Sequence, residues 1–271
     1  MEFAINHMTV ARLSFRDLVP LAARLGCTGI EVRNDLPQPL FDGMDPAAAG
    51  DLARSHGLRL LAVAEVKRFN DWSGDKAGEA LALIRIARAA GAEAVSLIPC
   101  NDGLGLGNGE RQAALRVALK ALRPMLEDHD LIGLVEPLGF EICALRHKSE
   151  AVDAIEALGA RGTFRLVHDT FHHHLAHGGP IYPAHTGIIH ISGVTDPDLG
   201  VAEMGDEHRV LVDERDRLGN LDQIAALAAA GYAGPVSFEA FAPSVHALAN
   251  PAGDLKASME FIRSRLAARA A

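Results

Sequence analysis

Short apolar segments alternate with longer amphipathic segments along most of the chain. The apolar segments are almost continuously hydrophobic rather than alternating, which is typical of parallel strands that are covered on both faces. We therefore expect eight strands, at residues 2–6, 29–33, 59–66, 94–99, 132–137, 164–169, 187–192 and 235–241.

The amphipathic segments between these strands predict helices, and several carry recognisable ends. Ser14 and Asp17 have the spacing of a capping box, and Gly26 and Gly91 stand where the first two helices should end. The expected helices are residues 14–25, 76–90, 109–128, 148–158, 220–230 and 252–268.

The repeated order of strand, helix, glycine and short turn predicts a β/α protein. Eight such units in 271 residues favour a (β/α)8 barrel, and a doubly wound open sheet is the structural alternative. No linker, shift in composition or low-complexity tail interrupts the pattern. We therefore expect a single barrel domain over residues 1–271.

Composition and charge narrow the function. The chain is 49% hydrophobic, enough to bury a large core, and its net charge of −9 argues against a protein that grips nucleic acid. No stretch of 18 apolar residues exists, so we expect no membrane partner. We therefore expect the protein to bind a small-molecule substrate. The sequence leaves open whether the chain is a monomer or a homodimer.

Cysteine usage favours a reduced, cytoplasmic setting. Cys27, Cys100 and Cys143 are widely spaced and form no CxxC pair, so neither a disulfide framework nor a cysteine zinc site is indicated. The first ten residues lack the basic and apolar regions of a signal peptide, which agrees with a cytoplasmic protein.

Chemistry in a barrel gathers at the carboxyl ends of the strands. Four polar residues there are difficult to explain structurally: Glu136, His190 and Glu239 interrupt apolar strands, and Asp169 closes one. A buried carboxylate must be paired, protonated or bound to a metal. Three carboxylates and one imidazole suit Mn²⁺, Mg²⁺ or Co²⁺, with Zn²⁺ also compatible. The alternative is an ion-pair network with Arg33, Lys67 and Arg209.

The stretch VHDTFHHHLAH, residues 167–177, raises the question of a histidine metal site. Asp169 ends the expected strand and can face the barrel mouth, and His172 follows on the next loop, within reach of a substrate. His168 should point to the opposite face of the strand. The remaining histidines are interpreted as solvated or as supporting groups: His173, His174 and His177.

Other polar positions allow two interpretations each. The glycine-rich segment 101–110 lacks the motif of a phosphate-binding loop, so we interpret it as a flexible active-site loop. Glu31 with Arg33, and Glu65 with Lys67, share a face within their strands and either bind substrate or pair with each other. The charged segment after strand 7 is mostly a solvated loop from which Arg209 can reach into the site as a fixed cation.

The motifs VEPLG, VHDTFHH, IIHISG and SFEAF together resemble the xylose isomerase-like barrel superfamily of sugar isomerases and epimerases. Within it, FAINHMT, GIEVRNDLPQPLF, DTFHHH and DEHRV are most similar to the 2-keto-myo-inositol (inosose) isomerases of inositol catabolism. The resemblance spans nearly the whole chain. The segment DERDRLGNLD after Arg209 departs from the PGxGxID stretch common in the superfamily, which affects the placement of that arginine.

The resemblance implies specific roles. The four metal ligands would be Glu136, Asp169, His190 and Glu239, and Glu136 and Glu239 would also act as the acid/base pair, with one divalent ion and no nucleotide cofactor. His172 and Arg209 would contact substrate hydroxyls. The implied reaction converts 2-keto-myo-inositol to 1-keto-D-chiro-inositol through an enediolate.

Other activities fit the same residues. A ketose 3-epimerase or an inosose dehydratase would use the same ligands and proton abstraction, and a non-catalytic sugar-binding barrel would bind the polyol without turnover. An endonuclease-IV-like nuclease fits these residues less well, because it would need about three zinc ions and more strand-end histidines.

Overall fold

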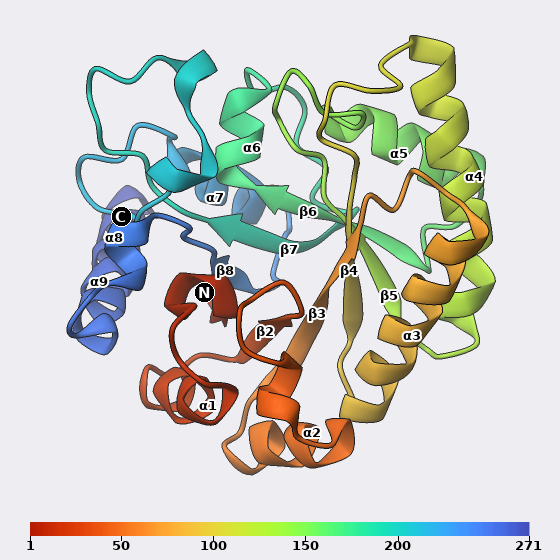
Figure 1. Cartoon of the computed structure of the whole chain (residues 1–271). Helices are drawn as coiled ribbons and strands as arrows, with labels where there is room; N and C mark the ends of the chain where they lie inside the picture. Colours follow the sequence, from red (N-terminus) through yellow and green to blue (C-terminus); the bar gives the residue numbers. More distant parts are fainter. Residues whose placement is uncertain (271) are drawn as a thin grey trace.

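The computed structural model describes residues 1–270 and contains a closed barrel of eight parallel strands that pair in chain order (Figure 1). Strand β8 pairs with β1, which excludes the open sheet and confirms the expected (β/α)8 fold. The strands are β1 (Phe3–Asn6), β2 (Gly29–Arg33), β3 (Arg59–Lys67), β4 (Ala94–Ile98), β5 (Ile132–Val135), β6 (Phe164–Asp169), β7 (Thr186–Ile191) and β8 (Val236–Phe238).

Four strands end earlier than the sequence pattern predicts, β4 and β7 by one residue and β5 and β8 by two or three. Strand β5 ends at Val135 and β8 ends at Phe238, so Glu136 and Glu239 follow their strands instead of interrupting them. Both residues still bond to a neighbouring strand, because the N–H of Glu136 donates to Leu97 O at 3.2 Å and that of Glu239 donates to Ile191 O at 2.9 Å. The backbone therefore remains anchored where the two side chains enter the barrel mouth.

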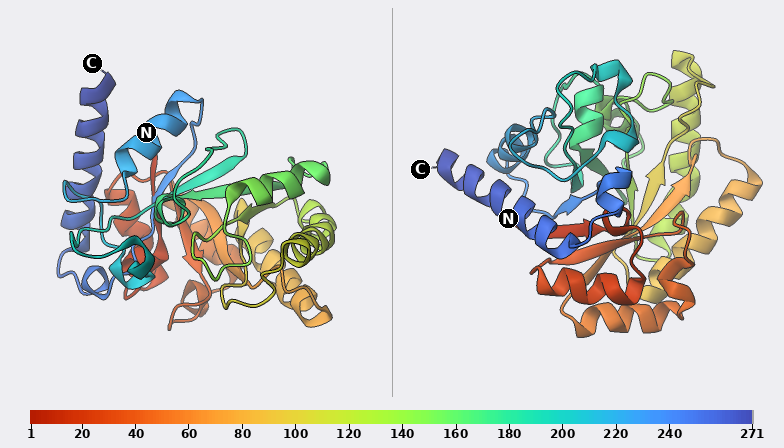
Figure 2. Two further views of the ribbon diagram at one scale, coloured as in Figure 1. Left: turned by 90° about the horizontal axis from the view of Figure 1, so that it is seen from above. Right: turned by 60° about the vertical axis from the view of Figure 1, so that its left-hand side comes forward.

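The helices surround the barrel as an outer layer (Figures 1 and 2). The six expected helices are present, and three more are helices that the pattern did not indicate: α2, α6 and α8. The helices are α1 (Phe15–Arg24), α2 (Pro46–Ser55), α3 (Gly74–Ala90), α4 (Asn108–Glu127), α5 (Lys148–Ala157), α6 (Thr170–Leu175), α7 (Asn220–Ala229), α8 (Pro243–His246) and α9 (Pro251–Ala270).

The termini of the helices follow ordinary capping chemistry. Ser14 Oγ accepts from the N–H of Asp17 at 3.1 Å at the start of α1. Asp45 caps α2 through the N–H groups of Ala47 and Ala48, directly before Pro46. That aspartate–proline pair was the available signal for α2.

Two apolar layers support the site. A large core fills the space between the strands and the helices, and a separate small cluster comes from six strands and fills the barrel interior. The interior cluster consists of Ala4, Leu61, Ala62, Ala94, Leu134, Val167 and Ile188. Polar side chains follow it toward the carboxyl end of the barrel, so the functional groups stand on a packed apolar floor.

Cys27, Cys100 and Cys143 are all buried and free. Within residues 1–270, no helix combines the length and the apolar character needed to cross a membrane.

Candidate metal centre

Glu136, Asp169, His190 and Glu239 converge at the carboxyl end of the barrel. Each offers one ligand atom, and these atoms all lie within 4.8 Å of one another. All four residues are at most 4% exposed. They come from β5 to β8, four consecutive strands of the closed sheet, which is why residues more than 100 positions apart meet on one side of the mouth.

The ring of His190 is oriented by a hydrogen bond on its far side. Its Nε2 lies 3.0 Å from Oε2 of Glu31, whose other oxygen accepts from the hydroxyl of Ser237 at 2.5 Å. Nδ1 is buried, has no hydrogen-bond partner among the described residues, and lies 3.2 Å from Glu239 Oε2 and 3.6 Å from Glu136 Oε1. The imidazole therefore presents one nitrogen to the carboxylates while the other is held by an acid.

This arrangement fits a divalent cation. A metal-ligating histidine commonly donates its second nitrogen to a carboxylate, which fixes the ring and raises its basicity. Three carboxylates with one imidazole form a donor set for Mn²⁺, Mg²⁺, Co²⁺ or Zn²⁺. Burial lowers the pKa of His190, but the charges of Glu31 and Glu239 outweigh it and raise the pKa well above its usual value. A bound cation would take the place of the proton on Nδ1.

Two arginines contact the same carboxylates. Arg209 Nη2 lies 2.6 Å from Asp169 Oδ2 and 3.0 Å from Glu239 Oε2. Arg33 Nη1 lies 2.9 Å from Glu239 Oε1. The ion-pair network that the sequence offered as an alternative is therefore partly present, around the proposed ligands rather than instead of them. Lys67 takes no part, since it forms no ion pair with the described residues.

The two glutamates have different electrostatic surroundings. Burial, with the nearby charge of Glu239, raises the pKa of Glu136 to about 7. Burial also acts to raise the pKa of Glu239, but His190, Arg209 and Arg33 together lower it below its usual value. Asn6 adds a further bond, from Nδ2 to Glu239 Oε1 at 3.1 Å. One carboxyl can thus exchange a proton near neutral pH, and the other is held ionised.

Asp169 joins the ligand cluster to helix α6. Its Oδ1 accepts from the N–H of His172 at 3.0 Å and so caps the helix, while Oδ2 accepts from Arg209. His172 consequently lies in a helix, whereas the sequence had suggested that it lies on a loop. Its ring is 4% exposed and contacts Phe140 and Phe171, and it lines the cavity above the ligands.

The cavity above the ligands has a volume of about 380 Å³. Its polar lining comes from both halves of the barrel, which suits a small molecule rich in hydroxyl groups. Asp35, Glu65, Lys67 and Asn101 line the half opposite the metal ligands, and Phe140 and Phe241 form apolar walls. Asn101 carries a buried Oδ1 without a hydrogen-bond partner.

The sequence left open whether Glu31 pairs with Arg33, and Glu65 with Lys67, or whether these residues bind substrate, and among the described residues neither pair forms. Glu31 bonds to His190 and Ser237, while Arg33 bonds to Asp35, Glu65 and Glu239.

The other histidines of the 167–177 segment lie behind the site. His168 is fully buried on the outer face of β6, and its Nε2 lies 2.9 Å from Gln223 Oε1, as expected for a residue that packs behind the sheet. His173 Nδ1 lies 2.8 Å from Nζ of Lys148. His174 and His177 are absent from the ligand cluster, so Asp169 is the member of this stretch that reaches it.

Several residues of the site were missed from the sequence. Ser192, Ser237 and Asp206 support the cluster through Glu31 and Arg209, and Asn6 bonds directly to Glu239. Ser192 directly follows β7 and Ser237 is the central residue of β8, and their interruption of apolar sequence was the signal that could have revealed them.

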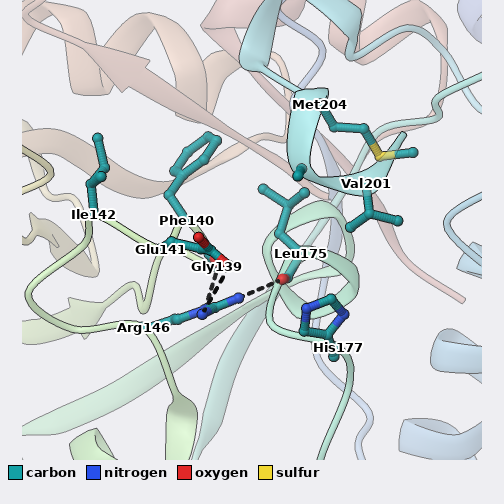
Figure 3. Close-up of a pocket in the computed structure, with 10 residues that line it drawn as sticks. Gly139, Phe140, Glu141, Ile142, Arg146, Leu175, His177, Val201 and Met204 are labelled. Atoms are coloured by element: carbon teal, nitrogen blue, oxygen red, sulfur yellow. Dashed lines mark hydrogen bonds and ion pairs between the residues drawn. The ribbon is translucent and has the colours of Figure 1, made fainter. Parts of the chain in front are cut away.

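A second cavity, of about 290 Å³, shares the side chain of Phe140 with the first (Figure 3). Arg146 spans its wall, with Nε bonded to Gly139 O at 3.0 Å and Nη2 bonded to Leu175 O at 3.2 Å. Arg146 thereby joins the loop after β5 to the end of α6, the helix that carries His172.

A family model described as xylose isomerase-like TIM barrel matches residues 19–265, and the chain belongs to this family. The fold is similar to a xylose isomerase domain-containing protein from Salmonella typhimurium LT2, with 29% identity, a TM-score of 0.89, and 98% of this chain and 97% of that chain covered. No curated protein sequence matches the chain.

Two more distant structures share the fold. The IolI protein, solved with a bound zinc atom, is 19% identical with a TM-score of 0.87, and 98% of this chain and 99% of that chain are covered. D-psicose 3-epimerase from Clostridium cellulolyticum H10, solved with D-tagatose, is 15% identical with a TM-score of 0.72, and 98% and 99% are covered.

Proposed function

We propose that the protein is a divalent-metal-dependent isomerase of a cyclic keto-polyol, with 2-keto-myo-inositol as substrate and 1-keto-D-chiro-inositol as product. The observation that carries the proposal is the buried cluster of Glu136, Asp169, His190 and Glu239 at the floor of a polar cavity. Membership of the xylose isomerase-like family and the likeness to the zinc-containing IolI structure support it.

The two glutamates would carry the proton transfer. A bound divalent cation would supply Lewis acidity to the substrate carbonyl and the neighbouring hydroxyl. Glu136, whose pKa is raised to about 7, is suited to remove the proton from the hydroxyl-bearing carbon beside the carbonyl, which leaves an enediolate. Return of a proton to the former carbonyl carbon, with transfer of the hydroxyl proton between the two oxygens, moves the ketone one position along the ring.

Glu239 would be the second carboxylate of the acid/base pair. Its contacts with Arg33 and Arg209 keep it ionised, so Glu239 is suited to hold the cation and to orient the substrate. His172 projects into the same cavity and is suited to bind a substrate hydroxyl. The second hydrogen on Nη1 of Arg209, which Asp206 does not accept, is suited to bind a substrate hydroxyl as well.

The test is deuterium exchange. Mn²⁺-loaded protein is incubated with 2-keto-myo-inositol in D₂O, protein and metal are removed, and the sugar is examined by proton NMR. A new inosose isomer with deuterium beside its carbonyl is expected. Glu136→Gln should lose both exchange and turnover by at least about 100-fold, and Glu31→Asp, which retains the acid behind His190, is a milder control.

Two other products would redirect the assignment. Loss of water with formation of a diketone would establish a dehydratase. No exchange with inososes, together with exchange at carbon 3 of D-psicose or D-tagatose, would establish a ketose 3-epimerase, the activity named for one structural neighbour. Binding of the polyol without exchange of any proton would show a sugar-binding barrel and contradict the proposal.

A further inference from the structure

Arg209 is buried, and most of its N–H donors are engaged by other residues of the protein. The residue is 1% exposed, and its guanidinium lies between the rings of Phe171 and Phe241, at 5.0 Å and 4.5 Å from their centroids. Its Nε donates to Ser192 Oγ at 2.9 Å and Nη1 donates to Asp206 Oδ1 at 3.1 Å. Nη2 donates to both Asp169 and Glu239.

Those contacts use four of the five N–H donors of a guanidinium. The backbone is fixed as well, because Arg209 O accepts from the N–H groups of Phe241 and Ala242 at 3.0 Å and 2.8 Å. The charge of Arg209 is therefore locked against two of the four proposed metal ligands, and it cannot swing away to solvent without breaking contacts to three strands' ends.

Arg33, the other arginine that contacts Glu239, differs from Arg209 in the acids that balance its charge. Arg33 also touches Glu239, but its Nε and Nη2 are engaged by Asp35 and Nη2 lies 3.2 Å from Glu65. Two acids outside the ligand cluster thus balance its charge. Arg209 has one such acid, Asp206, whose side chain is 46% exposed and therefore screened by water.

Charge balance gives Arg209 a role toward the cation. When all three are ionised, the carboxylates of the ligand cluster carry a charge of −3, a divalent ion supplies +2, and Arg209, which bonds to two of them, supplies +1. Without the ion, Arg209 is the cation that bonds to both Asp169 and Glu239 and so reduces the repulsion between them, while Arg33 and His190 contact Glu239 alone of this pair. With the ion, Arg209 and the metal are like charges at close range in a buried site, where such repulsion is weakly screened.

We propose that Arg209 is the counter-ion of the metal centre: it stabilises the metal-free site and weakens the binding of the divalent cation, so that the metal can exchange. The inference rests on the metal site of the proposed function. It assigns to Arg209 a positioning and electrostatic role beyond contact with substrate.

The test measures Mn²⁺ binding to metal-free protein by titration calorimetry, without substrate. In Arg209→Gln we expect the affinity to rise on the order of tenfold. Arg209→Lys, which keeps the charge, should remain within about threefold of the natural protein. The melting temperature of the metal-free Gln variant should fall by more than that of its Mn²⁺-loaded form.

Other outcomes overturn the inference. If Arg209 served only to shape the ligands, both variants would bind Mn²⁺ more weakly. Unchanged affinity in Arg209→Gln would have the same meaning. Should this variant be unfolded without metal, recovery of the fold on addition of Mn²⁺ supports the role, and failure to recover contradicts it. A natural protein that binds no divalent cation would instead remove the proposed function itself.

Discussion

Nε2 of His190 lies 3.0 Å from Oε2 of Glu31, and this contact directs the other ring nitrogen at the carboxylates of the site. Glu31 is fully buried, and its second oxygen is held by Ser237 at 2.5 Å. The pair joins β7 to β2 across the barrel interior. Glu31 therefore fixes both the rotation and the tautomer with which His190 meets a cation.

Glu31→Gln should weaken divalent-cation binding by about 10–100-fold, the usual effect of losing the carboxylate behind a ligating histidine. The amide keeps the shape of the side chain but removes the negative charge, so His190 becomes a poorer ligand. Calorimetric titration of metal-free protein with Mn²⁺ measures the change. Ser237→Ala is the matched control, because it removes a bond to Glu31 and keeps the charge; equal affinities in Glu31→Gln and the natural protein would contradict this role.

The ligand cluster illustrates what the sequence can reveal. Glu136 and His190 stand among apolar residues, and burying a charge in such surroundings is costly unless something pairs with it. That local anomaly, together with the strand order of a barrel, is sufficient to predict that the side chains meet. The eight strands could be predicted equally well, since buried parallel strands are continuously apolar.

The hydrogen-bond partners of these residues could not be predicted as well from the sequence. For Glu31 the sequence offered pairing with Arg33, two positions along the strand, or contact with substrate, yet Glu31 bonds to His190, 159 positions away. Contacts across a closed barrel depend on the register between strands, which no local pattern encodes. Helix α6 could be foreseen only as a loop or short helix, because its cap, Asp169, belongs to the strand pattern and its six residues are too few to show a helical period.

Gly139 allows the loop after β5 to pack directly on α6. A Cβ atom at this position would lie 2.1 Å from His172 O and 2.7 Å from Leu175 Cβ. Gly139→Ala should therefore displace α6 and lower the free energy of unfolding by about 1–3 kcal/mol, and raise KM through His172. Urea denaturation and steady-state kinetics measure both.

Gly162→Ala provides the comparison, since a Cβ there meets nothing within 4 Å. It should change neither stability nor KM appreciably. If Gly139→Ala behaved in the same way, the close contact between the loop and α6 would not constrain His172.

Lys67 ends β3 on the side of the cavity opposite the metal ligands. Its side chain is exposed and forms no hydrogen bond or ion pair within the described part of the chain. An ammonium group in this position can donate to the hydroxyls at the far end of a polyol. Lys67→Met should raise KM about 5–20-fold and change kcat less, as expected for binding that ground state and transition state share.

Lys256→Met, on the exposed face of α9, is the control and should leave KM unchanged. A drop in kcat without a change in KM for Lys67→Met would place Lys67 in the chemical step instead.

Lys148 begins α5 as a buried amine that forms no ion pair with a carboxylate of the described residues. Its Nζ contacts His173 Nδ1 at 2.8 Å, and burial lowers the pKa of the lysine from 10.5 to about 7. Between these two values the unfolded chain binds more protons than the folded protein, so this group makes stability increase as the pH rises. The destabilisation is complete below about pH 7 and disappears near pH 10.5.

Lys148→Met should therefore stabilise the protein at pH 7, by about 1–3 kcal/mol, because a side chain of similar length replaces a cation that folding must bury or neutralise. The gain should shrink toward zero at pH 10. Urea denaturation of both proteins at pH 7, 8.5 and 10 measures the difference. Lys120→Met, at an exposed position of α4, should give a small difference at every pH. A stabilisation of Lys148→Met that did not depend on pH would mean that improved packing, and not the buried charge, is responsible.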